Sequence, residues 1–423
     1  RGPGKAGRIE PGREDKRHTA AEPRPDTAGE VPARMVDGAQ RATDTHNHRA
    51  ILQWERRLPI VPWRRGVDEG SAAKPENGMP RTCVYVSNAE DTTIHVFGMD
   101  RLSGALTPIE VVEVPGSSLP SPTSLPMAIS PDQRHLYAAL RSGDFPLSVF
   151  HIDPKSGQLR HIAATPLVAA MAYITLDRRG RFLLGASYTD AKLAVYAIDA
   201  SGRVEAKARQ ILDTGPHAHS ILLDATNHFA YSAVLGADHV LQMIFDEETG
   251  LLSPNAPGMI ETRRGAGPRH LAFHPNGHFL YLLNQTDAKV YVFRVEPGAG
   301  TLAEIESLAT LPAHFYGEAN AADIHVTPDG RFLYTSERQT STLAGFRIDP
   351  ASGLLTMIDR WPTETTPRGF RIDPRGRFLL SAGLDSNHIG LHAIDPESGA
   401  LALQARIAVG AMPNWIEILD FED

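Results

Sequence analysis

The chain repeats one pattern of apolar and polar positions: an apolar strand, a turn rich in Pro, Asp and Gly, and a second strand rich in Phe, Tyr and Leu. In the first strand, apolar residues stand at alternate positions, as expected for a β-strand that packs between neighbours. The seventh copy is split, with its first strand at Ile416–Leu419 and its aromatic strand at Val84–Val86. The six complete copies are Met127–Tyr137, Ile174–Leu184, Ile221–Tyr231, Leu271–Tyr281, Ile324–Tyr334 and Phe370–Leu380.

A short acidic turn recurs in phase with these strands, and its Gly supplies the positive φ of a tight hairpin. Successive turns begin 46 to 53 residues apart, which is the length of one four-stranded blade of a β-propeller. The turns begin at Asp100, Asp153, Asp199, Asp246, Glu296, Asp349 and Asp395. In one blade the pattern predicts strands at His270–His274, Phe279–Leu283, Lys289–Val295 and Leu302–Ala309.

The repeats predict an all-β fold, a seven-bladed β-propeller over residues 79–423. The split copy places the N- and C-terminal strands in one blade. This pairing closes the ring and leaves no open propeller edge.

Residues 1–78 lack this periodicity and carry 15 basic and 12 acidic residues. Their one apolar cluster, Ile51–Trp63, is too short and too charged for a signal sequence or a membrane span. We therefore expect residues 1–78 to be a disordered or leader-like extension, with Met79 as the natural start.

Composition narrows the classes of partner. The 42 basic and 50 acidic residues provide no overall basic field of the kind that favours nucleic acid, and no membrane partner is expected. Cys83 is the only cysteine, which rules out an internal disulfide and makes the cytoplasm the expected location. Its apolar surroundings predict a small buried hydrophobe. The oligomeric state is left open.

The candidate functional residues lie at the start of the first strand, where equivalent positions of the repeat carry different types of residue. If this strand is innermost, its first residues line one mouth of the channel. Six residues before the turn, the seven copies read Leu125, Ala172, His219, Arg269, Ala322, Arg368 and Asn414. One residue later they read Pro126, Tyr173, Ser220, His270, Asp323, Gly369 and Trp415. His325 and Arg371 lie one step deeper.

Two arginines that converge with histidines and a carboxylate suit an anionic substrate and acid–base chemistry. Arg338 and Gln285, which hold matching places after the second strand of adjacent blades, are further candidates for the mouth. Each candidate also has a purely structural interpretation, such as a packed histidine or an inter-blade salt bridge. The histidines show no metal-binding spacing and the carboxylates do not cluster, so neither a metal nor another cofactor is predicted.

Four stretches of the chain resemble the propeller-type 6-phosphogluconolactonases: Gly265–Asn276, Ala321–Tyr334, Pro362–Phe370 and Pro413–Trp415. The resemblance covers residues 80–419. It implies hydrolysis of 6-phosphoglucono-δ-lactone to 6-phosphogluconate, a step of the oxidative pentose phosphate pathway in carbohydrate metabolism. The chain is then a hydrolase acting on a carboxylic ester, without metal, and its partner is a small sugar-phosphate lactone.

The resemblance carries the family's site histidine onto His219, its Pro-Arg-His onto Arg269 and His270, and its later Pro-Arg onto Arg368. Members often have Glu where this chain has Gln285, so a carboxylate that could serve as base is replaced by an amide.

The leading hypothesis is that Arg269 and Arg368 hold the phosphate and polarise the ring carbonyl. His219 or Asp323 then deprotonates the attacking water, and His270, Arg338 and Gln285 contribute to substrate binding. One alternative is a lactonising cycloisomerase of the carboxymuconate type, in which the same residues bind a dicarboxylate or tricarboxylate. The other is a non-catalytic propeller that binds protein partners at its rim.

Overall fold

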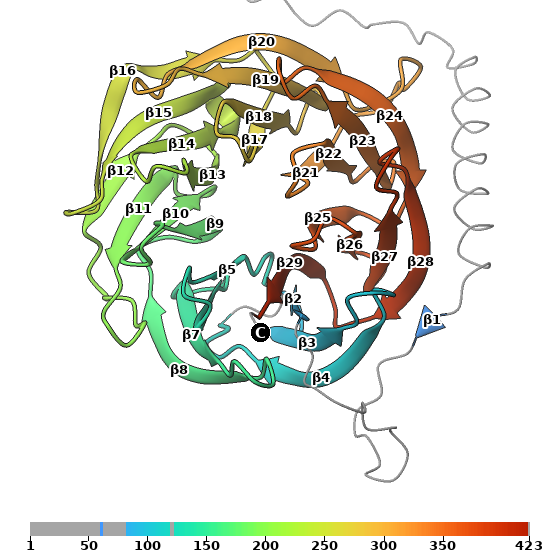
Figure 1. Ribbon diagram of the computed structural model, residues 1–423. Coiled ribbons are helices and arrows are strands. Elements are labelled where there is room, and N and C mark those ends of the chain that lie inside the picture. The colour runs from blue at the N-terminus through green and yellow to red at the C-terminus, as the bar shows by residue number, and fades with distance from the viewer. Residues whose placement is uncertain (1–59, 62–81, 119–121, 422–423) are drawn as a thin grey trace, which may run out of the picture. The chain divides into compact units, whose positions relative to one another are not determined.

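The computed structural model describes residues 60–61, 82–118 and 122–421, and almost all of its regular structure is β-strand. Seven sheets, each built on four antiparallel strands, surround a central channel (Figure 1), which confirms the predicted seven-bladed propeller. The expectations for residues 1–78 and for Met79 concern residues outside the described ones, apart from β1 (Ile60–Val61). This short strand pairs in parallel with β28 (Leu401–Ala408) at the outer edge of its blade.

Each blade has four strands, counted from the channel outward. The innermost strands are β29 (Pro413–Asp420), β5 (Met127–Ile129), β9 (Met171–Leu176), β13 (Ala218–Leu223), β17 (Pro268–Phe273), β21 (Ala321–Val326) and β25 (Pro367–Ile372). The second strands are β2 (Thr82–Asn88), β6 (His135–Ala139), β10 (Phe182–Ser187), β14 (Phe229–Val234), β18 (Phe279–Asn284), β22 (Phe332–Glu337) and β26 (Phe378–Gly383).

The two outer layers complete the blades. The third strands are β3 (Thr93–Met99), β7 (Pro146–Ile152), β11 (Lys192–Ala197), β15 (His239–Asp246), β19 (Lys289–Val295), β23 (Thr342–Ile348) and β27 (His388–Ile394). The outermost strands are β4 (Leu106–Glu113), β8 (Leu159–Pro166), β12 (Gln210–Asp213), β16 (Leu251–Glu261), β20 (Leu302–Ala309), β24 (Leu355–Pro362) and β28. A single 3-10 turn, η1 (Leu235–Ala237), follows β14.

The closing blade joins strands from distant parts of the chain. β29 pairs antiparallel with β2, so that Ile416 lies opposite Val86. The predicted split blade is therefore confirmed, and no second strand is left without an inner partner.

The acidic turns tie neighbouring blades together. In the turn that begins at Asp349, the carboxylate accepts a hydrogen bond from the backbone N–H of Ser352 at 2.7 Å. The turn Gly353 has a φ of 73°, and a Cβ there would lie 2.4 Å from the ring of Phe279 in the preceding blade. Only glycine meets both conditions without strain. Tyr281 of that preceding blade donates its hydroxyl to the Gly353 carbonyl at 3.0 Å. The same bond recurs from Tyr85 to Gly157, Tyr137 to Gly202, Tyr231 to Gly300 and Tyr334 to Gly399.

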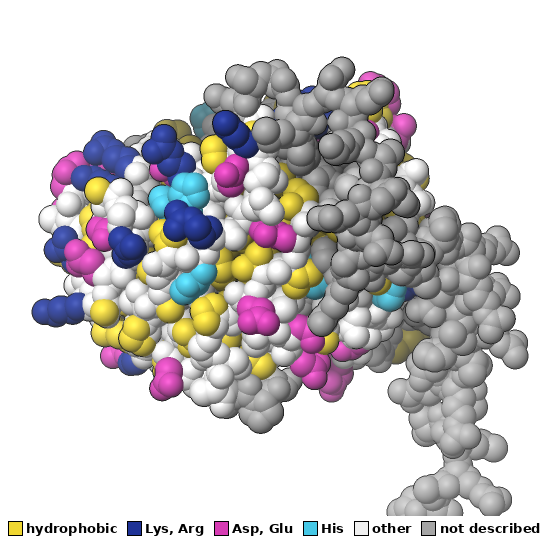
Figure 2. Space-filling view, turned by 90° about the horizontal axis from the view of Figure 1, so that it is seen from below, with side chains coloured by type: hydrophobic (Ala, Val, Ile, Leu, Met, Phe, Trp, Pro, Cys, Tyr) yellow, Lys and Arg dark blue, Asp and Glu magenta, His cyan; other side chains and the backbone are white. Residues whose placement is uncertain are grey.

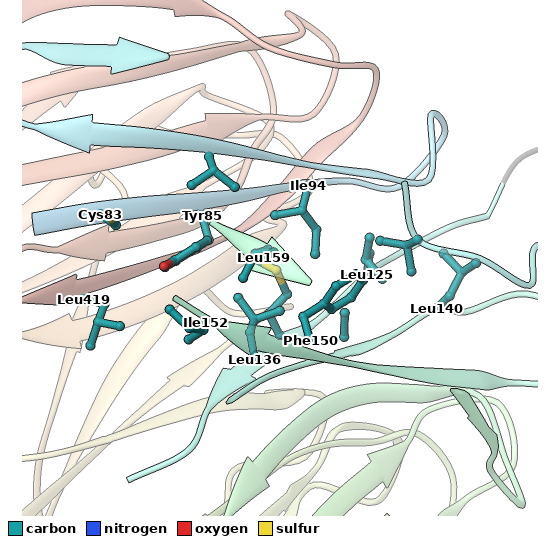
Figure 3. Close-up of a cluster of buried hydrophobic side chains, with 14 of the residues drawn as sticks. Cys83, Tyr85, Ile94, Leu125, Leu136, Leu140, Phe150, Ile152, Leu159 and Leu419 are labelled. Atoms are coloured by element: carbon teal, nitrogen blue, oxygen red, sulfur yellow. The ribbon is translucent and has the colours of Figure 1, made fainter. Parts of the chain in front are cut away.

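Apolar side chains fill the interfaces between blades. Figure 3 shows one such cluster, in which Cys83, Tyr85 and Ile94 of the closing blade lie with Leu136 and Phe150 of the next blade. All five are fully buried, and each large side chain contributes about 1.5–3 kcal/mol by leaving water. Cys83 is buried as predicted, and burial raises the pKa of its thiol to about 12.

The described residues include no helix whose length and hydropathy would allow it to cross a membrane. On the described surface visible in Figure 2, positively and negatively charged side chains both occur, together with hydrophobic ones. This mixture of charges differs from the interior of the channel, where charged side chains of different kinds lie at different levels.

Candidate functional site

The predicted mouth residues lie at β-bulges. In the pairing of β17 with β18, Pro268 lies opposite Asn284 and His270 opposite Leu283, so that Arg269 is the extra residue. The same irregularity leaves His219 extra in β13 and Arg368 extra in β25. A bulge re-aims the side chain that it inserts and is common beside active sites. We name the end of the channel where the inner strands begin the upper mouth.

Arg269 is the most deeply buried cation of the upper mouth, with only 1% of its surface exposed. Its Nε donates to Oε1 of Gln285 at 3.2 Å, and its Nη1 donates to the backbone carbonyl of Ala322. Burial lowers the pKa of Arg269 well below its usual range, and the charges of Arg338 and Arg368 lower it further. The partners are neutral oxygens, so the guanidinium charge is oriented without being neutralised.

Two further guanidinium groups of the mouth are held by neutral oxygens. Arg338 donates from Nε to the Asn320 carbonyl at 3.0 Å and from Nη2 to the side-chain oxygen of Asn320 at 2.5 Å. Arg368 donates from Nη1 to the Thr123 carbonyl at 2.8 Å. Burial lowers the pKa of Arg338 to about 10. Burial, followed by the charges of Arg338 and Arg141, lowers the pKa of Arg368 to about 9.

Arg141 and Tyr188 belong to the same mouth and were missed by the sequence reasoning. The Nε of Arg141 is buried without a hydrogen-bond partner among the described residues, and burial lowers the pKa of this arginine. Both residues follow the second strand of a blade, in the place that Gln285 and Arg338 hold in theirs. Reading that position around all seven copies, as was done for the inner strand, would have found them.

The four arginines of the mouth, which we call the arginine cluster, are Arg141, Arg269, Arg338 and Arg368. Within the described part of the chain, none of the four forms an ion pair with a carboxylate. Positive charges that are brought together, oriented by neutral oxygens and left without a carboxylate suit the binding of an anion.

His219 lies beside the arginine cluster and is 5% exposed. Its ring meets the rings of His270 and Tyr188 edge to face, at centroid distances of 5.1 and 5.8 Å, and its Nδ1 is buried without a partner among the described residues. Burial, reinforced by the charge of Arg269, lowers its pKa well below the usual range. His219 is therefore neutral at pH 7.

His270 is paired with Asp323 of the next blade, with Nδ1 and Oδ1 2.7 Å apart. Because a carboxylate only accepts hydrogen bonds, Nδ1 carries the proton and the lone pair lies on Nε2. That Nε2 is buried and lacks a partner among the described residues. Burial and the charge of Arg269 lower the pKa of His270 to about 4, against the opposing effect of Asp323. The result is an oriented, neutral imidazole with one free nitrogen.

Asp323 accepts four hydrogen bonds. Oδ1 accepts from His270 and from the backbone N–H of Ile324, and Oδ2 accepts from His325 at 3.2 Å and from the N–H of Phe370 at 3.1 Å. Burial alone would raise its pKa, but the two histidines and these bonds hold the pKa well below the usual range. A saturated carboxylate of this kind is a poor proton acceptor, which favours an orienting role over the role of base that the sequence had also allowed.

Three rings form a floor across the channel: Tyr173, His270 and Trp415. Tyr173 meets His270 and Trp415 edge to face, each at a centroid distance of 5.3 Å, and His270 meets Trp415 at 6.1 Å. Beyond the floor lies a cavity of about 420 Å³, lined by the later residues of the inner strands, among them His325 and Arg371. We call this space the lower cavity.

The structure thus divides the predicted residues by level. His219, Arg269, Arg338, Arg368 and Gln285 are at the upper mouth, and His270 and Asp323 are at its floor. His325 and Arg371 line the lower cavity, one step deeper. No group of three or more His, Cys, Asp or Glu side chains within the described ranges is arranged to hold a metal ion.

Comparison with known proteins identifies the family to which this fold belongs. The family described as "Lactonase, 7-bladed beta-propeller" matches residues 82–418. A 6-phosphogluconolactonase of Pectobacterium carotovorum is 40% identical over 337 residues, which cover 79% of this chain and 98% of that protein. The 6-phosphogluconolactonase of Yersinia pestis is 38% identical over 291 residues, covering 69% and 84%.

Among solved structures, the periplasmic gluconolactonase of Pseudomonas aeruginosa superimposes with a TM-score of 0.74 at 28% identity, over 81% of this chain and 99% of that one. The family match spans all seven blades and includes every residue of the upper mouth. This chain therefore belongs to the seven-bladed β-propeller lactonase family.

Proposed function

We propose that this protein hydrolyses 6-phosphoglucono-δ-lactone to 6-phosphogluconate. The observation that carries the proposal is the arginine cluster, free of carboxylate partners in the described chain, next to an imidazole that Asp323 orients. The names of the Pectobacterium and Yersinia relatives support the same activity.

The arginine cluster binds the two parts of the substrate that carry or develop negative charge. Arg338 and Arg368, which are only half-buried, bind the phosphate, because a guanidinium matches two phosphate oxygens at once. Arg141 adds a third positive charge beside them. The deeper Arg269 polarises the lactone carbonyl and stabilises the oxyanion that forms when water attacks.

His270 is the base in this mechanism. Its free Nε2 takes a proton from the attacking water, whose oxygen bonds to the carbonyl carbon. The ring C–O bond then breaks, and the ring oxygen receives the proton from the imidazolium. His219, whose ring contacts His270, hydrogen-bonds the attacking water. The carboxylic acid that is formed releases one proton to solvent, so the reaction balances as lactone plus water to carboxylate plus a proton.

The low pKa of His270 suits this order of events. In the free protein the imidazole is neutral at pH 7 and can accept a proton at once. Binding of the anionic substrate offsets the arginine charges that oppose protonation, and so raises the basicity of His270 in the complex.

The direct test is the rate at which freshly prepared 6-phosphogluconolactone disappears with and without the protein, measured beside unphosphorylated gluconolactone. We expect acceleration well beyond the spontaneous rate and a preference for the phosphorylated lactone. No acceleration, or an acceleration at substrate concentrations below KM that is unchanged in the double variant Arg338→Ala with Arg368→Ala, would defeat the proposal.

We also propose a cytoplasmic location, where the phosphorylated substrate would be found. Cys83 is a buried free thiol, so the fold needs no oxidising compartment for a disulfide. Cell fractionation tests this directly, and recovery of the protein from the periplasm would contradict it.

A further inference from the structure

Asp323 is shared by two histidines on opposite sides of the channel floor. His270 bonds to Oδ1 and belongs to the upper mouth, with 5% of its side chain exposed. His325 bonds to Oδ2 at 3.2 Å, lines the lower cavity and has 23% of its side chain exposed. The second imidazole therefore contacts the pair of His270 and Asp323 from the side of the lower cavity.

The position of His325 is defined by its strand. Asp323 and His325 are two residues apart on β21, and both line the lower cavity. The ring of His325 also packs edge to face against Phe370 of the neighbouring blade, at a centroid distance of 4.8 Å. This packing keeps Nε2 directed at the carboxylate.

A carboxylate that serves two imidazoles couples their protonation. When His325 gains a proton, its positive charge offsets Asp323 and opposes a second proton on His270. The charge of His325 is among the causes that lower the pKa of His270, and it is the leading cause that lowers the pKa of Asp323 against the opposing effect of burial.

We propose that His325 is a positioning residue for hydrolysis at the upper mouth, which holds Asp323 from the lower cavity and sets the pH range in which His270 can accept a proton. The proposal rests on the proposed function in one respect only, that His270 acts as the base.

Other charged groups face His325 from the strands around the lower cavity, and they are already paired. Arg371 of β25 forms an ion pair with Glu417 of β29 at 3.0 Å. Arg178 donates to the backbone carbonyls of the next blade. The full set of titratable and charged groups that line the cavity is Tyr173, Asp177, Arg178, His270, Asp323, His325, Arg371 and Glu417. Of the two histidines in this set, His325 is the more exposed, with 23% of its side chain exposed against 5% for His270.

Two substitutions separate the hydrogen bond of His325 from its charge. His325→Gln keeps an N–H donor in the region of Nε2 and cannot become charged. We expect its kcat at pH 7.5 to stay within about twofold of the wild type. We expect the acid limb of its kcat/KM profile to lie at higher pH than in the wild type, because a positive charge near His270 is lost. His325→Leu removes the donor as well. We expect kcat to fall about 10- to 100-fold with KM within about twofold.

A spectroscopic readout tests the coupling without using activity. In the wild type, the N–H proton shared by His270 and Asp323 gives a downfield NMR signal that Asp323→Asn abolishes. We expect this signal to move between about pH 5 and 8 in the wild type and to stay constant over the same pH range in His325→Gln. The exposed His278, replaced by Gln, is the matched control and leaves both the signal and the profile unchanged.

The possible outcomes are distinct. A signal that moves identically in the wild type and in His325→Gln overturns the inference, whatever the protein hydrolyses. Equal loss of kcat in the Gln and Leu variants, with the acid limb unmoved, also overturns it, because that is the result of a packing role alone. If the lactone is not hydrolysed but the signal responds as expected, the coupling stands and the proposed function fails.

Discussion

The two halves of the channel are built from the same seven inner strands, but the arginines on those strands have different kinds of partner in each half. At the upper mouth three members of the arginine cluster, Arg269, Arg338 and Arg368, are held by carbonyl and amide oxygens, and none of the four has a carboxylate partner among the described residues. In the lower cavity Arg371 is paired with Glu417 at 3.0 Å. A paired charge needs no ligand, whereas oriented and unpaired charges bind one. The difference supports the proposal that an anionic substrate binds at the upper mouth.

The floor makes this difference possible. Tyr173, His270 and Trp415 separate the two halves, so the cations of the upper mouth are kept from the carboxylates below. Asp323 serves both sides, through His270 above and His325 below. The comparison between the halves can be tested by substitutions on each side.

The largest effect is expected from His270→Gln. The substitution removes the imidazole whose Nε2 is the proposed base, and the loss of a positioned base costs about 100- to 10,000-fold in kcat. Steady-state kinetics on fresh lactone measure this, and an unchanged circular dichroism spectrum shows that the fold is intact. A loss below tenfold would assign the base elsewhere, His219 being the next candidate.

Arg338→Ala and Arg368→Ala are expected to weaken binding of the phosphorylated lactone. Each removes charge-assisted hydrogen bonds worth about 1.5–3 kcal/mol, so KM rises about 10- to 150-fold. Unphosphorylated gluconolactone serves as the control substrate, and its KM should change by less than about threefold. Equal losses for both lactones would show that these arginines do not bind the phosphate.

The pH dependence follows from the lowered pKa of His270. A base must be unprotonated to act, so kcat/KM is constant above the pKa and falls as pH drops through about 4. One unit below that value, about a tenfold loss is expected. The profile is measured by initial rates corrected for spontaneous hydrolysis. An acid limb near the unperturbed histidine value of about 6.5 would mean that burial does not control this group.

Gln285→Glu makes the upper mouth resemble the lower cavity, because it places a carboxylate beside Arg269. The new pair neutralises one positive charge, and KM for the phosphorylated lactone rises about fivefold, equivalent to about 1 kcal/mol. Gln285→Ala is the matched control, since it removes the acceptor without adding charge. A tenfold increase in kcat for Gln285→Glu would instead indicate that a carboxylate at this position acts as a base.

Glu417→Gln makes the reverse change, because it leaves Arg371 unpaired in the lower cavity. We expect kcat/KM at pH 7.5 within about twofold of the wild type. The free energy of unfolding should fall by less than about 1 kcal/mol, since Arg371 is 39% exposed. Rates and thermal melts test both. A tenfold loss of activity would show that pairing in the lower cavity does matter to the reaction.

Much of the fold could be predicted because its determinants are local and repeated. β19 and β20 have the predicted bounds, and β17 begins two residues before the predicted start. β17 begins earlier because the chain bulges at Arg269, and Pro268 pairs with Asn284 beyond this bulge. A bulge depends on the partner strand, so the pattern along one strand does not reveal it.

The candidate site was predictable in part for the same reason. His219, Arg269 and Arg368 stood out by comparison of equivalent positions in the inner strand. Arg141 and Tyr188 were missed because the position after the second strand was read in two copies only. Asp323 could be named but its role could not, since three of its four hydrogen-bond donors come from His270, His325 and the backbone of Phe370.

The sequence by itself determined the number of blades, their closure by strands from distant parts of the chain, and the turns that hold them together. These depend on period-two apolar patterns and on glycines whose φ is positive, both of which are properties of short segments. Only the tertiary structure decided which charges at the channel are paired and which are free. Pairing depends on distances between different blades, and those distances exist only once the ring has closed.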